Sequence, residues 1–292
     1  MNIHNDRAQN ETVPQLDPFQ LLTVALFAGL AMSTFVLCAL PLLYAESRFP
    51  QPWPKIVGLV GAALAVFALE APIPWVAVAF SMGLVFSDQV QKGKNLWGAL
   101  GSAVLVAIGI SLVLFFFQMN IQGGEPLTFW RDLVHSLVTE VQGSFKSDTA
   151  ADWALLEKLI YEEAPFLVGG LAFVSAWLSL GAAVHFGWGP GEPPLASAQL
   201  RDSLELPVWL SALATAAFFV SLVVPLPFYV SGIARFLCCL LFMQGTLFLS
   251  SALARRNVAR GRRTWVYGIS VVFGFYALIV LGMVRVFKRK KR

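Results

Sequence analysis

The residues that could do chemistry in this chain are few, and they lie in or beside long apolar runs. Glu70 stands between two short apolar stretches, next to two prolines, and Arg235 lies near the start of a later run. Gln244 and Gly245 lie near the middle of that same run. A charged or amide side chain surrounded by apolar groups is costly unless it finds a partner, so such residues are suspects for function. The candidate ligand-binding residues are therefore Gln244, Gly245, Glu70 and Arg235.

The motifs of common catalytic and metal sites are missing from the sequence. It contains no Gly-rich phosphate loop, no His-Glu-x-x-His, no Cys-x-x-Cys and no Gly-x-Ser-x-Gly. The histidines are scattered and the cysteines all lie inside apolar runs: His4, His135 and His185; Cys38, Cys238 and Cys239. The sequence therefore predicts no enzyme activity, no bound metal and no cofactor.

The composition indicates a membrane protein. Hydrophobic residues make up 57% of the chain, charged residues only 13%, and the mean hydropathy is +0.69. A helix that crosses a bilayer needs roughly 20 mostly apolar residues. The apolar runs here are continuous rather than alternating, which favours helices over a barrel. We expect an all-α, polytopic transmembrane bundle of about eight spans with one amphipathic extramembrane helical segment.

The chain divides at its polar stretches. The expected segments are a polar tail at 1–18, transmembrane helices 1–4 at 19–118, an acidic amphipathic interfacial segment at 119–164, transmembrane helices 5–8 at 165–287, and a basic tail at 288–292. Within the first group, residues 55–87 predict two short helices, which either span separately or form a re-entrant hairpin.

Three further expectations concern where individual spans begin and end. The first apolar run, Phe19 to Ala45, is predicted to be one span that Pro41 bends or closes. Pro165 is expected to open the fifth span. The last span is predicted from Thr264 to Phe287.

The segment between the fourth and fifth spans is amphipathic. Apolar side chains recur at helical spacing after Phe129, and a second amphipathic helix is expected from about Asp152 to Glu163. These helices would lie on the bilayer surface or cap the bundle. The alternative is a lid over a cavity or a docking face for a partner.

Each candidate ligand-binding residue also has a structural interpretation, which we favour. The Gln244 amide could bond to a neighbouring helix, while Gly245 would let two backbones approach closely. Glu70 could be a carboxylate in a turn at the membrane interface. The Arg235 side chain could extend to lipid headgroups.

The orientation in the membrane is undecided from charge alone. Lys and Arg favour cytoplasmic loops. Counted over the loops of an eight-span topology, they divide equally between the two sides, because the Arg255–Arg263 loop and the basic tail flank the last span.

Three features of residues 200–292 together resemble the YybS-like family of bacterial multi-pass membrane proteins. They are a basic-acidic loop that enters an apolar helix through Leu206-Pro207-x-Trp209, the Gln244-Gly245 pair, and a last helix with Gly282 followed by a basic tail. The chain departs from the expected pattern at Arg285, where an aspartate is expected, and has Phe287 as the nearby aromatic residue.

The resemblance implies a fold distantly similar to the substrate-binding components of energy-coupling vitamin transporters, with both termini in the cytoplasm. That likeness concerns the fold and supplies no activity. We expect a multi-pass protein of the bacterial inner (plasma) membrane that is a small-molecule or lipid-binding or transport component. The alternative is a non-catalytic scaffold or assembly partner of an envelope complex.

The expected partners follow from charge. After Glu205 the chain has twelve Lys and Arg and no acidic residue. We expect Arg255–Arg263 or the basic tail to contact anionic lipid headgroups. A membrane protein is a further expected partner, and nucleic acid is not expected.

Overall fold

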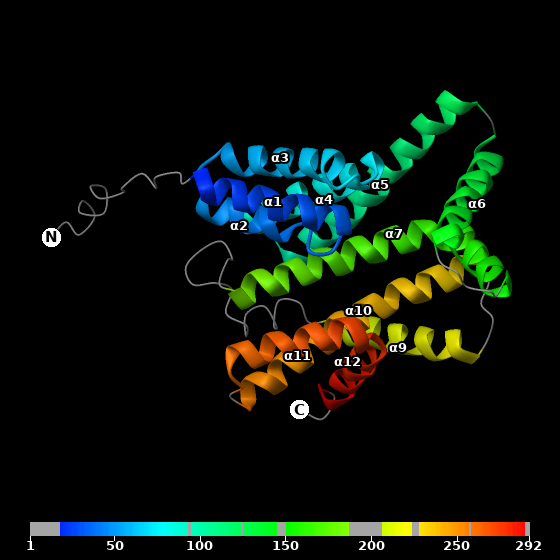
Figure 1. Cartoon of the computed structure of the whole chain (residues 1–292). Helices are drawn as coiled ribbons and strands as arrows, with labels where there is room; N and C mark the ends of the chain where they lie inside the picture. Colours follow the sequence, from blue (N-terminus) through cyan, green and yellow to red (C-terminus); the bar gives the residue numbers. More distant parts are fainter. Residues whose placement is uncertain are drawn as a thin grey trace.

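The computed structural model describes residues 18–92, 95–123, 125–144, 150–186, 206–223, 228–256 and 258–289. Within these ranges every regular element is an α-helix, so the predicted all-helical class is confirmed. The expected polar tail up to residue 17 and residues 290–292 of the basic tail lie outside them. Figure 1 shows one group of helices, α1 to α5, and a second group, α9 to α12, with α7 running between the two.

Within the described ranges, four helices are long and apolar enough to cross a membrane. The segments concerned are Ile73–Gln91 in α4, Leu96–Ile121 in α5, Phe166–His185 in α7 and Val230–Leu253 in α10. A bent pair near the C-terminus would make five, if it is counted as one span. The apolar helices Pro18–Thr34, Trp53–Phe67 and Val208–Ser221 are shorter. The described residues therefore support membrane helices, and the expected count of eight exceeds the four to five that length and composition identify.

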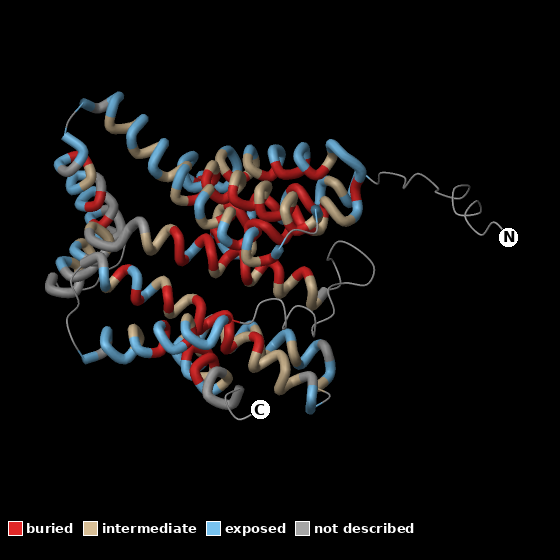
Figure 2. The backbone as a smooth tube through the Cα atoms, turned by 180° about the vertical axis from the view of Figure 1, so that it is seen from behind, coloured by how far each residue is buried: buried red, intermediate tan, exposed pale blue. Residues whose placement is uncertain are grey.

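The outer surface is rich in exposed apolar side chains. Phe67 and Phe273 are each 85% exposed, and Trp265 is 75% exposed. Buried residues instead follow the inner faces of the helices and continue along α7 (Figure 2). Large apolar patches are rare on soluble monomers, whereas lipid covers them on a membrane protein.

The first expected span is broken and folds back on itself. Helix α1 (Pro18–Thr34) ends in a turn at residues 35–39, and α2 (Leu40–Arg48) follows. Tyr44 and Phe49 pack in one cluster with Val24, so α2 returns antiparallel to α1. Pro41 lies in the first turn of α2, where its missing N–H has no helical partner to lose. The prediction of one span from Phe19 to Ala45 therefore differs from the structure, because Pro41 begins a helix instead of closing one.

Helices α3 (Trp53–Phe67) and α4 (Ile73–Gln91) form an antiparallel hairpin. Both helices expected at residues 55–87 are present, but only α3 is short, because α4 has 19 residues and is long enough to cross a membrane. Helix α3 lies directly against α1, since a Cβ on Gly29 would be 3.0 Å from the Gly61 carbonyl oxygen. The paired glycines let the two backbones touch. The ring of Trp75, at the start of α4, lies 4.7 Å from the ring of Phe35.

Helix α5 (Leu96–Gln122) runs from one end of the bundle to the other. The side chain of Asn95 caps its start by accepting a hydrogen bond from the Trp97 backbone N–H at 3.1 Å. The chain then enters α6 (Pro126–Ser144), which stands across the end of the bundle where α5 ends and α7 begins (Figure 1).

Helix α7 (Ala150–Phe186) passes without a break through Pro165. The expected boundary between an interfacial helix and the fifth span is therefore absent. A proline inside a helix leaves the carbonyl four residues earlier without its donor, and here that carbonyl belongs to Tyr161. The indole Nε1–H of Trp130, on α6, donates to the Tyr161 carbonyl oxygen at 2.9 Å. A side chain from another helix thus replaces the missing N–H.

Helices α9 (Val208–Val223) and α10 (Phe228–Arg255) begin the second group. Helix α10 runs parallel to α7: Gly232 meets Phe166 near one end, and Thr246 bonds to Trp177 further along both helices. The last expected span, Thr264 to Phe287, differs from the structure. It consists of α11 (Arg260–Phe273) and α12 (Phe275–Arg289), which are bent by 105° at Gly274.

Candidate functional site

Gln244 lies in the interior of the second group and is only 3% exposed. Gly245 beside it is the contact point with α12, because a Cβ there would overlap the carbonyl oxygen of Leu278. Gly282 plays the reciprocal role, since its Cβ would overlap the carbonyl oxygen of Leu241. The expectation that Gly245 permits close backbone approach is confirmed, and Gly282 supplies the matching surface on α12.

A polar contact joins α10 to α7 near Gln244. The indole Nε1–H of Trp177 donates to the Thr246 hydroxyl oxygen at 2.9 Å, and that hydroxyl donates to the Met243 carbonyl at 2.7 Å. The buried Trp177 indole and the half-buried Thr246 hydroxyl thus satisfy each other between two parallel helices. The surroundings of Gln244 are therefore those of a helix contact.

The other two predicted residues lie elsewhere. Glu70 is exposed, in the turn between α3 and α4, with a left-handed φ of 52°. The Ala71 N–H bonds back to the Ala65 carbonyl at 2.9 Å across it, so Glu70 occupies the position where a helix end reverses its backbone. Arg235 is exposed on α10. Gln244 and Gly245 are buried together, whereas Glu70 and Arg235 do not join them, so the four do not form one site.

The most unusual backbone lies in the turn between α1 and α2. Phe35 and Leu37 have φ values of 59° and 58°, which is the left-handed region that a bulky side chain rarely adopts. Phe35, Cys38 and Ala39 are nevertheless buried. Strained residues of this kind persist only when the surrounding structure holds them, and they gather at functional sites.

Helix α7 holds this turn with one serine. The Ser175 hydroxyl donates to the Phe35 carbonyl oxygen at 2.7 Å, and its oxygen lies 3.3 Å from the Cys38 sulfur. Because its only proton goes to Phe35, the Cys38 S–H is the donor in the second contact. The result is a chain of hydrogen bonds from thiol to hydroxyl to carbonyl, in an otherwise apolar region.

Ser179 lies one turn further along the same face of α7. It is fully buried, and its hydroxyl oxygen has no hydrogen-bond partner among the described residues. An unsatisfied buried hydroxyl costs about 1–3 kcal/mol. We call Phe35, Cys38, Ser175 and Ser179 the turn site.

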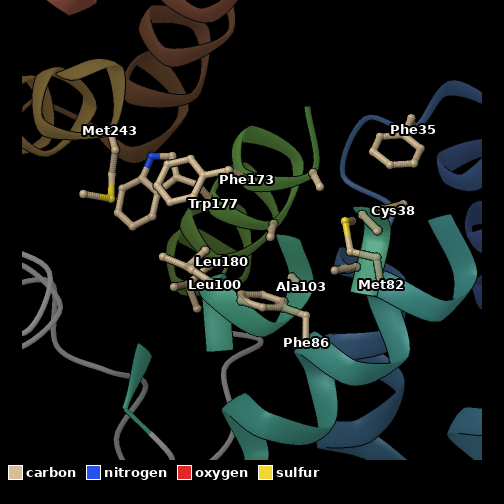
Figure 3. Close-up of a cluster of buried hydrophobic side chains, with 14 of the residues drawn as sticks. Phe35, Cys38, Met82, Phe86, Leu100, Ala103, Phe173, Trp177, Leu180 and Met243 are labelled. Carbon is tan, nitrogen blue, oxygen red and sulfur yellow. The ribbon is translucent and has the colours of Figure 1, made fainter. Parts of the chain in front are cut away.

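The turn site is enclosed by fully buried apolar side chains. Met82 and Phe86 of α4, Leu100 of α5 and Leu180 of α7 have at most 1% of their surface exposed. Figure 3 shows Cys38 close to Met82, with Phe86 and Leu100 further along the same cluster. These side chains leave a ligand little polar surface besides the two serines and the thiol.

Sequence reasoning missed the turn site because residues 35–39 contain neither glycine nor proline. The one signal was Pro41, which favours the first turn of a helix as well as a bend. The alignment of Ser175 with Ser179 at a spacing of four was visible, but it does not reveal what lies opposite.

No match was found. Comparisons with protein-family models, with curated proteins and with solved structures find nothing similar to this chain. The resemblance to the YybS-like family therefore stays a prediction. Of its three motifs, the basic-acidic loop at residues 201–205 lies outside the described residues, while Leu206 is buried and Trp209 is exposed.

Metal binding has no support in the described side chains. No three His, Cys, Asp or Glu side chains among them gather where they could hold a metal ion. The polar groups of the turn site are one thiol and two hydroxyls within an apolar cluster.

Proposed function

We propose that this chain is a multi-pass protein of the bacterial inner membrane that binds a small apolar molecule or a lipid chain at the turn site. The observation that carries the proposal is the strained turn at Phe35 and Leu37, together with the unpaired Ser179 hydroxyl one helical turn along α7 from Ser175. Discontinuous helices inside a membrane bundle often mark transporter binding sites. Non-helical backbone is tolerated at that depth only when protein or a cavity surrounds it.

The chemistry of the turn site limits the ligand. Ser179 can donate or accept one hydrogen bond, and the Cys38 thiol and Ser175 hydroxyl are already engaged with each other. The enclosure around them is apolar. A mostly hydrocarbon molecule with a single hydroxyl or carbonyl group fits this description, and a charged ligand does not.

The test uses the purified full-length protein in mild detergent. Solvent extraction and mass spectrometry should recover a small molecule that raises the thermal unfolding temperature (Tm) when it is added back. In Ser179→Ala this Tm shift should vanish. Ser87→Ala is the matched control, because Ser87 is equally buried but its hydroxyl already bonds to the Leu84 carbonyl at 3.1 Å. An equal shift in both variants would contradict binding at the turn site.

For a transport role, we propose that some of the shorter apolar helices also cross the membrane. We propose that α3 and α9, of 15 and 16 residues, cross a locally thinned bilayer, and that α1 and α2 enter and return. Gln244, Gly245, Glu70 and Arg235 remain candidates for later steps of such transport. We propose no enzyme activity and no cofactor.

The alternative, a scaffold that assembles with another envelope protein, is favoured by α6. This helix is fixed to α7 by the Trp130 bond to Tyr161 and by a contact of 3.1 Å between His135 Nδ1 and the Glu157 carboxylate. Deletion of residues 126–144 should then abolish co-purification of a partner while the bundle stays folded. The deletion stops at 144 because α7 is continuous from residue 150 into the membrane.

A further inference from the structure

The fold gathers basic residues from distant parts of the chain at one end of the bundle. Arg48, Lys55 and Lys92 lie at the end of α2, the start of α3 and the end of α4, and all three are exposed. Lys55 and Lys92 both act electrostatically on Glu46, which places them together. Asp88 pairs with Lys92 at 2.7 Å at the same end.

Contacts along α7 bring the second group to this end. Gly169 lies against Val104 and Ile108, so α7 runs antiparallel to α5 and finishes where α5 begins, near Lys92. The His185 ring, at the last turn of α7, lies 2.8 Å from the Thr264 hydroxyl of α11.

The arginines between α10 and α11 therefore lie at the same end of the bundle as Lys92. Since α10 runs parallel to α7, its last residue, Arg255, comes out at this end as well (Figure 1). Arg256 and Arg262 are exposed beside it. We define the basic end by its exposed cations: Arg48, Lys55, Lys92, Arg255, Arg256 and Arg262.

The opposite end has a different charge. It carries α6 and the first turns of α7, where the described cations Arg131 and Lys158 stand among Glu125, Asp132 and Glu157. The described charges of α6 and the first turns of α7 are thus of both signs, whereas cations predominate at the basic end.

We infer that the basic end is a docking surface for anionic phospholipid headgroups of the cytoplasmic leaflet, and that α6 lies on the opposite, outer side of the membrane. Exposed Lys and Arg next to membrane helices are retained on the cytoplasmic side and attract its anionic lipids. The acidic neighbours at this end, Glu46 and Asp88, are outnumbered by the six exposed cations.

The folded-back first span changes the side on which the chain enters the bundle. A straight span from Phe19 to Ala45 places the N-terminus opposite Arg48, on the side of residues 119–164. In the structure, α2 returns along α1, so the chain enters α1 on the side where Arg48 lies. The start of α1 therefore lies at the basic end, and α6 lies at the opposite end (Figure 1).

Site-directed labelling tests the orientation. Gly261→Cys, exposed at the basic end with nothing near its Cβ, is paired with Gln142→Cys, exposed on α6. A membrane-impermeant maleimide should label Gln142→Cys in right-side-out spheroplasts and Gly261→Cys in inside-out vesicles. The assay is run in the wild-type background and in a variant with Cys38, Cys238 and Cys239 changed to Ala. The reverse pattern, or labelling of both from one side, would overturn the inference.

Lipid binding is tested in nanodiscs of phosphatidylcholine with and without phosphatidylglycerol. Phosphatidylglycerol should raise the Tm of the wild type, and the shift should shrink as salt is added. The variant R255Q/R256Q/R262Q should lose most of this shift, whereas R131Q/K158Q, at the opposite end, should keep it. Equal shifts in both variants would refute a lipid surface at the basic end. Neither the labelling result nor the Tm shift in nanodiscs depends on the turn site. The proposal of a ligand at the turn site is therefore tested separately.

Discussion

The bond between Trp130 and Tyr161 allows a sharp test of how α7 tolerates a proline. Trp130→Phe keeps an aromatic ring but removes the indole N–H that reaches the Tyr161 carbonyl at 2.9 Å. Because Pro165 has no N–H, that carbonyl then has no donor from its own helix. We expect Trp130→Phe to destabilise the attachment of α6 to α7.

The magnitude follows from the hydrogen bond. A typical bond contributes about 1 kcal/mol net, and a carbonyl left unsatisfied away from water costs about 1–3 kcal/mol. The smaller ring also loses packing against Phe115, whose ring centre lies 5.8 Å from that of Trp130. The total therefore contains a packing loss that must be separated from the bond.

A double-mutant cycle with Pro165→Ala makes this separation. Alanine restores an N–H at position 165, which can bond to Tyr161 within the helix. In that background Trp130→Phe should lose only packing, so its cost should fall by about 1–2 kcal/mol relative to the wild-type background. Unfolding in mixed micelles of mild detergent and dodecyl sulfate, followed by circular dichroism, measures the four free energies.

The reasoning fails if Trp130→Phe costs the same free energy in both backgrounds. That result would mean that the indole contributes packing alone. A control at Thr139, whose hydroxyl bonds to the His135 carbonyl within α6 at 2.8 Å, should show no coupling to position 165 when changed to Val.

Three further predictions concern the helix contacts and one carboxylate. Gly245→Ala should force α12 away from α10 and lower the free energy of unfolding by about 1–3 kcal/mol, whereas Gly101→Ala, with no atom within 4 Å of its Cβ, should be neutral or stabilising. Ser175→Ala removes the donor to Phe35 and should speed alkylation of Cys38 by a small permeant reagent; an unchanged rate would contradict its role in holding the turn. Burial raises the pKa of Glu46 above its ordinary 4.5, and the charge of Asp88 raises it further, while Lys55 opposes both. Protonated Glu46 therefore favours the folded state at low pH, and this contribution to the free energy of unfolding is lost as the pH rises through the raised pKa. Glu46→Gln should therefore raise Tm at pH 7 but leave it unchanged at pH 4.

The helical membrane class could be predicted because it depends on composition alone. Continuous apolar runs and few charges leave hardly any other fold, and the exposed apolar side chains agree with it. The role of Gly245 was also predictable, since a glycine in a membrane helix has close packing as its ordinary use. Its partner, Gly282, was visible only as part of a motif.

Three features of the fold could not be predicted, and each depends on residues far apart in the sequence. The turn at residues 35–39 needs Ser175 opposite Phe35, and the continuity of α7 through Pro165 needs Trp130. The bend at Gly274 separates halves of 14 and 15 residues that look like one span by hydropathy. A prediction from local propensity places a helix break at glycine or proline. It therefore missed the turn at residues 35–39, which contains neither, and wrongly placed a helix boundary at Pro165.

The candidate functional residues also divide into one that could be predicted from the sequence and a group that could not. Gln244 was correctly suspected of being buried, because an amide in the middle of an apolar helix needs an interior position. The turn site escaped notice because its residues are common ones: a phenylalanine, a cysteine and two serines. Only the left-handed backbone and the unpaired Ser179 hydroxyl distinguish them.

The bond from Ser175 to Phe35 also sets an order of events during synthesis. The two residues are 140 positions apart, so the ribosome completes the α1–α2 turn long before it makes the hydroxyl that satisfies its carbonyl. Chains emerge at about 5–20 residues per second, which leaves the nascent turn waiting for roughly 7 to 28 seconds. The Phe35 carbonyl therefore gains its Ser175 donor only after that part of α7 has been made.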